Sequence, residues 1–397
     1  MTRIEDNELS SDDSLTEKIG ELASRLTQIP SRPGRDQMRP VLDAVVTWLR
    51  SRAFPFTVIS GEDTEPLGIV VGNLDQQADK ILCFNACLDT ADYGDESKWS
   101  LSPTSGMITE GWLYGRGSAD SKMAVAIFLH LLEFIDLDDA FAQGRVICFF
   151  DCDEHSGEFQ GIQRLVAQVP TLDTIAIGYP GEDRLMIGAR GFLRATISFS
   201  GPSRHSGSRS VTISAIDRAA QAALELGAWS QARAAEGNAV YPKASAVAMN
   251  GGTSFAVTAD RCEMKVDMRL TPDFTEMAAR DLLHEITKRA TGGDQTYPAK
   301  IDFHPGWPAY VLPDTALIVS AIRSAHREVY NQALNLAVAG PSNIGNFLAG
   351  RGIQATCGFG VRYENLHAPN ERACIKDAPN VLRVYYRAYK KLMAEWA

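Results

Sequence analysis

Apolar and polar positions alternate at two different periods along the first half of the chain. From Ser14 to Arg50 the apolar residues recur at helical spacing, with a break at Ile29–Gly34, which predicts two helices. Residues 92–118 are rich in turn formers and predict a long ordered loop. The other expected elements are strands at 67–74, 80–88, 145–152 and 174–177 and helices at 120–134 and 161–169. This alternation is typical of a sheet with helices on both faces.

The pattern changes near Arg190. The elements expected after it are a strand at 192–200, a helix at 211–226, strands at 244–249 and 261–270, a helix at 275–289 and a strand at 300–303. This βαββαβ order is typical of a small ferredoxin-like unit. From Thr315 helix and strand alternate again, ending in a helix at 380–395. We therefore expect one larger domain in two parts, 1–189 and 306–397, with a small domain at 190–305 inserted between them.

Composition narrows the class of protein. With 397 residues, 45% of them apolar, the chain can bury a core in each of two domains. The seven cysteines are odd in number and several lie in apolar runs, which indicates reduced thiols in a cytoplasm. A formal charge of −10 and a pI near 5.3 argue against a nucleic-acid partner, which needs a basic surface.

The ends and apolar runs of the chain indicate a cytoplasmic protein. Residues 1–18 are acidic and lack an apolar stretch, so they predict neither a secretory signal nor a transit peptide. The first dozen residues are expected to be frayed or to form an arm. No apolar run reaches the roughly 18 to 20 residues of a membrane-spanning helix, so no membrane partner is expected.

The segment FFDCDEHSG, 149–157, carries the first candidate chemistry. The buried strand expected before it leads directly into four ionisable side chains, Asp151, Asp153, Glu154 and His155. In open α/β sheets ligands bind beyond the carboxyl ends of the strands, so an acid and a histidine at this place indicate a functional site.

Three further segments hold candidate partners for this site. GRGSADSK contains Asp120, NLHAPNE contains His367, and GPSRHSGS contains His205. Each residue also has an ordinary structural role as an alternative. Asp120 would cap the helix that follows it, and His367 and His205 would be solvated, as most loop histidines are. Together with Glu154 and His155 they indicate a divalent metal site of two imidazoles and a carboxylate, with Glu154 as the acid beside a water.

Six motifs in order resemble those of a known family. They are CLDT (87–90), GRGSADSK, DEHSG (153–157), RHSG, VDMR (266–269) and HAPNE. From about Leu15 to its end the chain resembles the zinc metallopeptidase family of acetylornithine deacetylase, succinyl-diaminopimelate desuccinylase, aminoacylase and related dipeptidases. The resemblance implies an α/β catalytic domain, with a mixed sheet and helices on both faces, and an inserted ferredoxin-like α+β lid or dimerisation domain. It also implies a homodimer or higher homo-oligomer acting on a small substrate.

The resemblance assigns roles to five residues. Asp120 matches a carboxylate that bridges two metals, and His367 matches a ligand of the second metal. Glu154 matches the catalytic base. His205 matches a histidine presented to the substrate across a dimer, and Asp89 matches the aspartate of a His-x-Asp pattern that orients a ligating histidine.

Three departures from the family pattern alter the expected metal site. Cys87 stands where the family has a first-metal histidine, Tyr179 where it has an acidic ligand, and His155 where it has a second-metal glutamate. A tyrosine with a pKa near 10 is a poor ligand at neutral pH, whereas imidazole and carboxylate are good ones. We therefore expect one divalent ion, zinc, manganese or cobalt, held by Asp120, His155 and His367. Cys87 is a further candidate ligand, and a second ion is the alternative.

Replacing a glutamate ligand by His155 makes the expected site more positive, which favours an anionic substrate group. Arg190, Arg269 and Arg362 are candidates for binding a substrate carboxylate. The alternative role for these arginines is a salt bridge at the surface or between elements. For Arg190 and Arg362 the sequence favours neither role over the other. Tyr179 would suit an aryl substrate.

The expected activity is metal-dependent hydrolysis of a C–N bond. Glu154 would take a proton from the attacking water and return it to the leaving nitrogen, while His205 stabilises the developing oxyanion. The substrate would be an N-acyl amino acid or short peptide. Since the resembled family also includes a nitroanthranilate aminohydrolase, hydrolytic deamination of an aromatic amine is a second expectation. A decayed enzyme that only binds a small ligand is the alternative from another class.

Overall fold

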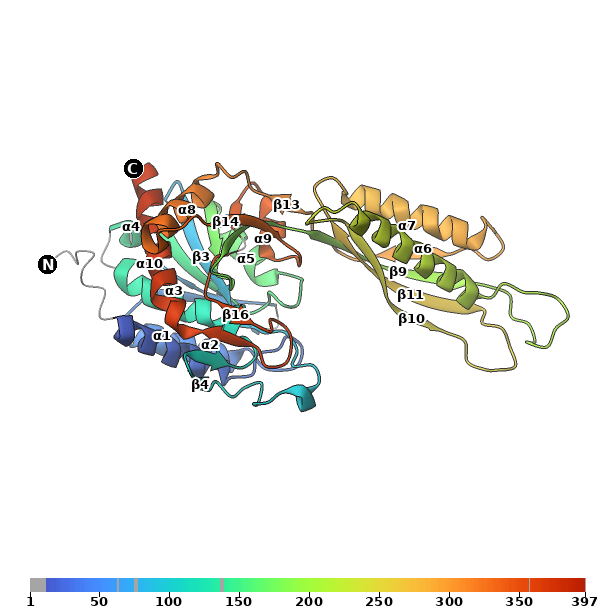
Figure 1. Ribbon diagram of the computed structural model, residues 1–397, viewed down its shortest axis with the longest axis horizontal. Coiled ribbons are helices and arrows are strands. Elements are labelled where there is room, and N and C mark those ends of the chain that lie inside the picture. The colour runs from blue at the N-terminus through green and yellow to red at the C-terminus, as the bar shows by residue number, and fades with distance from the viewer. Residues whose placement is uncertain (1–11, 63, 75–77, 136–138, 357, 397) are drawn as a thin grey trace. The chain divides into compact units, whose positions relative to one another are not determined.

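The computed structural model describes residues 12–62, 64–74, 78–135, 139–356 and 358–396 (Figure 1). The expectation for the N-terminal arm falls on residues 1–11, outside this range. The chain forms two compact units. Unit 1 comprises residues 1–188, 312–337 and 343–397, and unit 2 comprises residues 189–311 and 338–342. The expected boundary at residue 305 therefore lies inside unit 2, which continues to Val311.

A six-stranded mixed sheet organises unit 1, as predicted. Its order is β1-β2-β6-β3-β7-β15. Strands β1 and β2, and β2 and β6, pair antiparallel, whereas β6, β3, β7 and β15 run parallel. The bounds are β1 (Phe56–Ser60), β2 (Pro66–Val71), β3 (Ile81–Cys87), β6 (Val146–Asp151), β7 (Leu172–Ile177) and β15 (Gln354–Thr356). The parallel strands β3, β6 and β7 end at one edge, where ligands bind in such sheets.

Successive side chains of β6 point to opposite faces of this sheet. Val146, Cys148 and Phe150 join the core cluster that contains residues of α1, α2, α3, α8 and α10. Helix α5 contacts β1 and β2, and its buried Ile162 and Leu165 lie outside that cluster. The helices of unit 1 are α1 (Asp12–Thr27), α2 (Arg39–Arg50), α3 (Met123–Ile135), α4 (Asp139–Ala142), α5 (Gln160–Gln168), α8 (Leu317–Tyr330), α9 (Ile344–Ala349) and α10 (Ala378–Glu395).

A second sheet of unit 1 joins two segments that are far apart in the sequence. Its order is β16-β17-β5-β4, with antiparallel neighbours. The bounds are β4 (Ile108–Thr109), β5 (Trp112–Tyr114), β16 (Tyr363–Glu364) and β17 (Arg372–Cys374). The region expected to be only a loop thus contains two strands and the short helix η1 (Glu96–Lys98). Because β17 pairs with β5, residues 365–371 are brought to the segment that follows Tyr114.

Unit 2 has the predicted ferredoxin-like order. It contains β9 (Gly191–Ser200), α6 (Ala215–Ala235), β10 (Lys243–Gly251), β11 (Arg261–Leu270), α7 (Glu276–Thr291) and β12 (Lys300–Phe303). The sheet order is β10-β11-β9-β12, all antiparallel. Side chains from one face of this sheet and from both helices form a separate core. The remaining strands, where the chain passes between the units, are β8 (Arg184–Ala189), β13 (Tyr310–Val311) and β14 (Asn335–Ala339).

The start of one helix and the presence of one strand differ from the sequence prediction, each for a local reason. Helix α6 begins at Ala215 rather than at residue 211, because Ser214 and Asp217 form a reciprocal capping box. Strand β1 is missing from the prediction because only one of its five residues is fully buried, so it lacks a strong apolar pattern. Within the described residues, no helix is long and apolar enough to cross a membrane.

Candidate active site

The candidate site of unit 1 lies where the parallel strands end. Cys87 ends β3 and pairs in register with Asp151, which ends β6. Tyr179 lies two residues beyond the end of β7. The loops that follow β3 and β6 carry Asp89 and His155. The common edge of neighbouring parallel strands thus brings together residues from three separate parts of the sequence.

Asp120 does not cap a helix, so its ordinary alternative is wrong. Helix α3 begins at Met123, and Asp120 has extended backbone angles (φ −117°, ψ 91°) and precedes a cis peptide bond. Its buried Oδ2 lies 2.9 Å from His367 Nε2 and 3.7 Å from His155 Nε2. Burial raises the pKa of Asp120, but the neighbouring imidazoles of His155 and His367 outweigh burial and hold the pKa of this carboxyl below its usual range. The carboxylate is therefore charged between two imidazoles.

His155 lies in the loop after β6 and is held by Asp89. Its backbone N–H donates to Asp89 Oδ2 over 2.7 Å, and its Nδ1 lies 3.3 Å from the same oxygen. Both ring nitrogens of His155 are buried and make no hydrogen bond. The same is true of Asp89 Oδ1. Buried polar atoms normally have a partner, so these atoms fit a bound ion.

Two groups of side chains could hold a metal ion. In one, ligand atoms of Asp120, His155 and His367 all lie within 4.8 Å of one another; in the other, ligand atoms of Cys87, Asp89 and His155 do so. The first group offers two imidazoles and a carboxylate, which suits zinc, manganese or cobalt. His367 is half-exposed, which leaves this side of the group open to solvent.

Glu154 precedes His155 and lies against Tyr179. The Tyr179 hydroxyl donates to Glu154 Oε1 over 2.5 Å, while Oε2 lies 3.4 Å from His155 Nδ1. Burial raises the pKa of Glu154 to about 7. The positive charge of His155 opposes this shift, and the negative charge of Asp120 adds to it. Burial also raises the pKa of Tyr179 well above its usual 10, so the hydroxyl keeps its proton. A carboxyl group with a pKa near 7 can both accept and donate a proton near neutral pH.

Cys87 is buried beside the cluster. Its Sγ lies 3.1 Å from Ser121 Oγ and 3.7 Å from Asp120 Oδ1. Burial and the negative charge of Asp120 raise the pKa of this thiol well above its usual range. The protonated thiol donates toward neighbouring oxygens, whereas a metal ligand would have to be a thiolate.

Glu371 is a residue of the site that the sequence analysis does not single out. Its carboxylate is fully buried, pairs with Arg116 at 2.5 Å and accepts the backbone N–H groups of Gly117, Ala119 and Asp120. It thereby fixes the backbone that carries Asp120. In the sequence, the only indication of this role is that Glu371 is the charged residue at the end of the HAPNE motif, four positions after His367.

A family model described as Peptidase family M20/M25/M40 matches residues 83–391. The chain belongs to this family. The resemblance stated from the motifs is thus confirmed, and the chain is a hydrolase of amide or peptide bonds in a family that uses divalent metal ions.

Named relatives of the M20 family cover most of the chain. Succinyl-diaminopimelate desuccinylase of Psychrobacter arcticus is 26% identical over 330 residues, 79% of this chain and 79% of the relative. That of Psychromonas ingrahamii is 24% identical over 395 residues, 96% of this chain and all of the relative. A tripeptidase structure from Staphylococcus aureus aligns with a TM-score of 0.76 at 18% identity, over 96% and 99% of the two chains. A dinuclear metal binding M20 peptidase of Bacillus subtilis aligns with a TM-score of 0.67 at 15% identity, over 96% and 99%. These structures show the fold.

Three predicted site residues of this M20 chain belong to unit 2 and are described there. His205 is exposed, and its Nδ1 accepts the N–H of Gly207 over 3.0 Å. Arg269 pairs with Asp267 at 2.8 Å. Arg190 donates from Nε to Gly340 O and from Nη1 to Tyr241 O. Burial and the nearby charge of Arg269 lower the pKa of Arg190.

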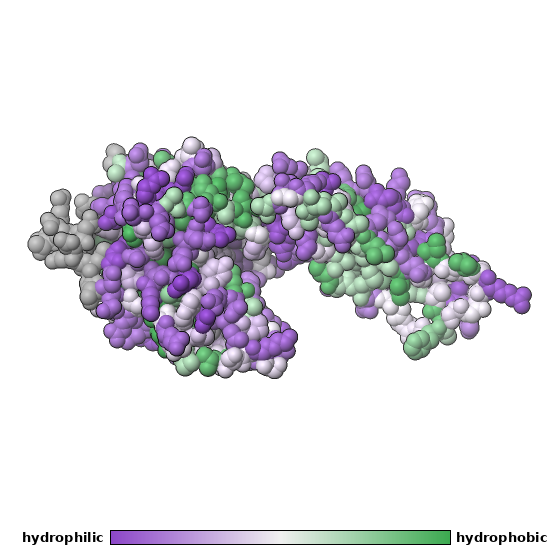
Figure 2. Space-filling model, viewed as in Figure 1, coloured by the Kyte–Doolittle hydropathy of each residue, from purple (hydrophilic) through white to green (hydrophobic). Residues whose placement is uncertain are grey.

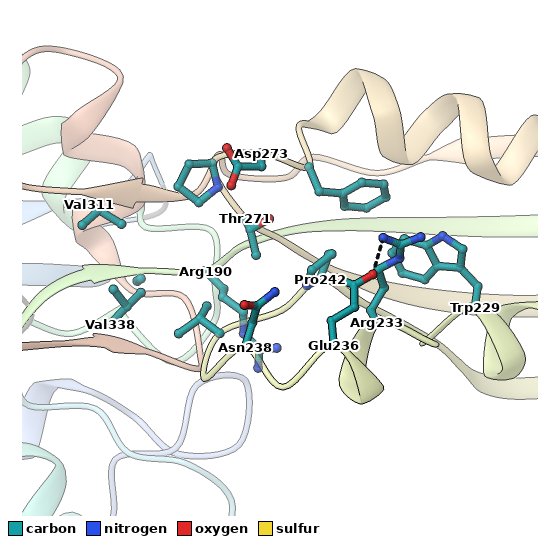
Figure 3. Close-up of a pocket in the computed structure, with 14 residues that line it drawn as sticks. Arg190, Trp229, Arg233, Glu236, Asn238, Pro242, Thr271, Asp273, Val311 and Val338 are labelled. Atoms are coloured by element: carbon teal, nitrogen blue, oxygen red, sulfur yellow. Dashed lines mark hydrogen bonds and ion pairs between the residues drawn. The ribbon is translucent and has the colours of Figure 1, made fainter. Parts of the chain in front are cut away.

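Arg190 also lines a pocket of about 500 Å³ within unit 2 (Figure 3). In the close-up, Val311 and Val338 lie on one side and Trp229 on the other, with Asn238 beside Arg190. Arg233 at its far end is paired with Glu236.

Arg362 lies in unit 1 with structural partners. Its guanidinium lies over the Trp112 ring at 5.2 Å and donates to Cys374 Sγ, and its backbone N–H donates to Asp377. These contacts join Arg362 to β5, to β17 and to the residues that follow β17, so they connect elements of unit 1. Asp151 and Asp153 likewise stabilise the loop after β6, because Asp151 accepts the N–H of Asp153 and Asp153 accepts that of Gln160.

Proposed function

We propose that the protein is a metal-dependent amidohydrolase that removes the acyl group from a small N-acyl amino compound bearing a carboxylate. The observation that carries this proposal is the placement of Glu154 next to the cluster of Asp120, His155 and His367. A carboxyl group that can accept and return a proton, placed beside a metal site, is an arrangement suited to hydrolysis of an amide by water. The named desuccinylases, which act on a succinyl amide, support the choice of substrate class.

One divalent ion per site is part of this proposal. Asp120, His155 and His367 would hold it, and when bound it would polarise the carbonyl group and make the attacking water more acidic. Tyr179 cannot serve a second ion while its hydroxyl donates to Glu154. The other group, Cys87 with Asp89, depends on the same His155, so the two groups compete for one imidazole.

In the proposed reaction Glu154 performs both proton transfers. Glu154 takes a proton from the water as the water oxygen bonds to the amide carbon. It then gives that proton to the nitrogen as the C–N bond breaks. Asp89 holds His155 from the side of Nδ1, which leaves Nε2 facing Asp120. We further propose that His205 donates to the developing oxyanion and that Arg269 and Arg190 bind the substrate carboxylate.

A panel assay with metal analysis tests the function. Wild-type protein loaded with zinc, manganese or cobalt is incubated with N-succinyl and N-acetyl amino acids, dipeptides and nitroanthranilate. We expect release of the acyl product, one bound ion per chain, and a loss of about 10²- to 10⁴-fold in kcat for Glu154→Gln with the ion retained. Two tightly bound ions would contradict the single-metal site. Ammonia release from nitroanthranilate alone would show deamination, and tight binding without turnover would show a binding protein.

We also propose that unit 2 pairs with unit 2 of a second copy along strand β10. This strand lies at the edge of its sheet, and Val247 and Met249 on it are exposed. Phe255 and Val257, in the hairpin that follows, are exposed as well. Figure 2 shows green, apolar surface along this part of unit 2. An exposed edge strand with apolar side chains favours pairing with another strand, and a second copy supplies the same edge.

A further inference from the structure

The hydrogen bond between Tyr179 and Glu154 connects the ends of two strands of unit 1. Tyr179 follows β7, Glu154 follows β6, and the hydroxyl of one lies 2.5 Å from Oε1 of the other. Both side chains are partly buried. From the sequence, Tyr179 is expected to be a poor metal ligand and a candidate substrate contact. In the structure its hydroxyl contacts the candidate base.

The backbone around Tyr179 is fixed on both sides. Gly178 N–H donates to Asn85 O in β3 over 2.7 Å, and Gly181 N–H donates to Val361 O over 2.9 Å. Gly360 approaches so closely that a Cβ there would lie 2.1 Å from Tyr179 O. The backbone from which the Tyr179 side chain starts is therefore fixed, and from it the hydroxyl reaches Glu154.

The two carboxylate oxygens of Glu154 have different surroundings. Oε1 accepts the Tyr179 hydroxyl, whereas among the described residues Oε2 accepts no hydrogen bond and has His155 Nδ1 at 3.4 Å. Fixing one oxygen sets the plane and direction of the whole carboxylate. Oε2 is therefore the oxygen that is available for proton transfer, in an orientation that is set before substrate binds.

The charge of the surroundings favours a neutral donor at this place. The negative charges of Asp120 and Asp89 both oppose a negative charge on Glu154. A hydroxyl donor stabilises the carboxylate without adding charge, and hydrogen bonds to charged groups are stronger than those between neutral groups. An acidic residue at position 179 would instead add a third negative charge beside Glu154 unless a cation neutralised it.

We propose that Tyr179 is the positioning residue of the general base, holding Oε1 of Glu154 so that Oε2 carries the proton. This inference rests on the proposed amide hydrolysis. In the reaction an O–H bond of water breaks and its proton moves to Oε2, while the water oxygen bonds to the amide carbon. The C–N bond then breaks with its electron pair on nitrogen, which takes the proton from Oε2. The Tyr179 proton stays on tyrosine throughout.

The first experiment is Tyr179→Phe in the metal-loaded, full-length protein. Phenylalanine keeps the ring and its packing and removes only the hydroxyl. We expect kcat to fall about 10- to 100-fold, the size of a hydrogen bond to a charged group, with KM within about twofold and metal content unchanged. Tyr385→Phe is the control, because Tyr385 is a buried tyrosine on α10 whose hydroxyl donates to Phe359 O. Its kcat should stay at the wild-type value.

A double-mutant cycle tests whether Tyr179 acts through Glu154. In the Glu154→Gln background, Tyr179→Phe should change kcat less than about twofold, because the base it positions is gone. The same four proteins, unfolded in urea, should show non-additive midpoints, a readout that needs no substrate.

Each other outcome overturns the inference. Wild-type kcat in Tyr179→Phe, or equal falls in both backgrounds, would show that Glu154 needs no positioning by Tyr179. A raised KM at unchanged kcat would make Tyr179 a substrate contact, and loss of the ion would make it a ligand. If the wild-type protein hydrolyses no amide at all, the proposed function has failed and the inference fails with it. If the wild type is active and Tyr179→Phe has the same kcat, the inference alone is contradicted.

Discussion

Asp89 is the residue whose role changes most between sequence and structure. In the family pattern this aspartate orients a histidine two positions earlier, where this chain has Cys87. In the structure its Oδ2 instead faces His155, at 2.7 Å from the backbone N and 3.3 Å from Nδ1. A carboxylate behind a ligating imidazole fixes the ring and strengthens the metal bond. Asp89 thus faces an imidazole from the loop that follows the neighbouring strand β6.

Replacing Asp89 by asparagine should weaken metal binding. The amide keeps the shape but removes the charge behind His155, so we expect the Kd for zinc or manganese to rise about 10- to 100-fold. Isothermal titration against a competing chelator measures this. Asp95→Asn, an exposed acid in the same region, is the control and should leave Kd unchanged. An unaltered Kd in Asp89→Asn would show that His155 does not depend on Asp89.

Glu371 supplies a second prediction at this scale. Replacing it by glutamine removes the negative charge beside buried Arg116 and leaves one amide oxygen to accept from both Arg116 and the three backbone N–H groups. We expect the metal-free protein to lose about 3–5 kcal/mol, seen as a lower urea midpoint. Glu364→Gln removes a glutamate that pairs with Arg372 at the surface and should cost less than about 1 kcal/mol. Equal midpoints for the two variants would contradict the structural role of Glu371.

The sequence predicts Asp120, Glu154, His155 and His367 as a group because each lies in a short motif at a strand end or loop. It does not predict what lies between them. Glu371 has partners more than two hundred residues earlier in the chain, and the bond from Tyr179 to Glu154 joins two loops. Such contacts depend on which strands are neighbours, and the sequence pattern does not determine strand order.

At the scale of elements, helix α3 contributes a pH-dependent stability through His130. This side chain is buried, its Nδ1–H donates to Ala126 O, and Trp48 lies edge-on to it. Burial lowers its pKa below 6.5; Glu133 opposes this shift, and Arg52 and Lys18 add to it. The unfolded chain therefore binds a proton here more readily than the folded protein. The stability that neutral His130 contributes is therefore fully present above about pH 7. It is lost as the pH falls below the pKa of His130 in the unfolded chain.

His130→Leu tests this contribution. Comparing urea unfolding of wild type and variant cancels the other titrating groups. We expect the stability of the wild type relative to the variant to fall by about 1 kcal/mol between pH 7.5 and 5.5. A difference that stays constant over this range would show that His130 is protonated alike in both states.

The pattern of apolar residues predicts the long elements well and the short ones poorly. Both N-terminal helices, the mixed sheet and the βαββαβ order of unit 2 agree with the structure, because each buries a repeating face. Strands β4, β5 and β16 have two or three residues each and lie in segments rich in turn formers. The pairing of β17 with β5 and β16 brings the loop of His367 to Asp120, so the sheet that completes the site is the one without a sequence pattern.

At the scale of the whole molecule, the proposed pairing of β10 makes a size prediction. Val247→Glu places a charge on the edge strand, where it would have to be buried between two copies, so the dimer should dissociate. Analytical ultracentrifugation of the wild type should give twice the mass of the variant. Met277→Glu, an exposed position on α7, is the control and should remain dimeric. A monomeric wild type would overturn the pairing.

The order of synthesis gives the inserted unit 2 one more consequence. Strand β15, His367 and Glu371 all follow unit 2 in the chain, whereas Asp120, Glu154 and His155 precede it. During synthesis Asp120, Glu154 and His155 therefore leave the ribosome early, and His367, the last proposed metal ligand, leaves it late. Until residue 371 has left the exit tunnel, the backbone that carries Asp120 has no carboxylate to bind and the ion has only part of its ligands. With the metal site proposed above, a nascent chain that has not yet exposed residue 371 should therefore be inactive and bind the ion only weakly.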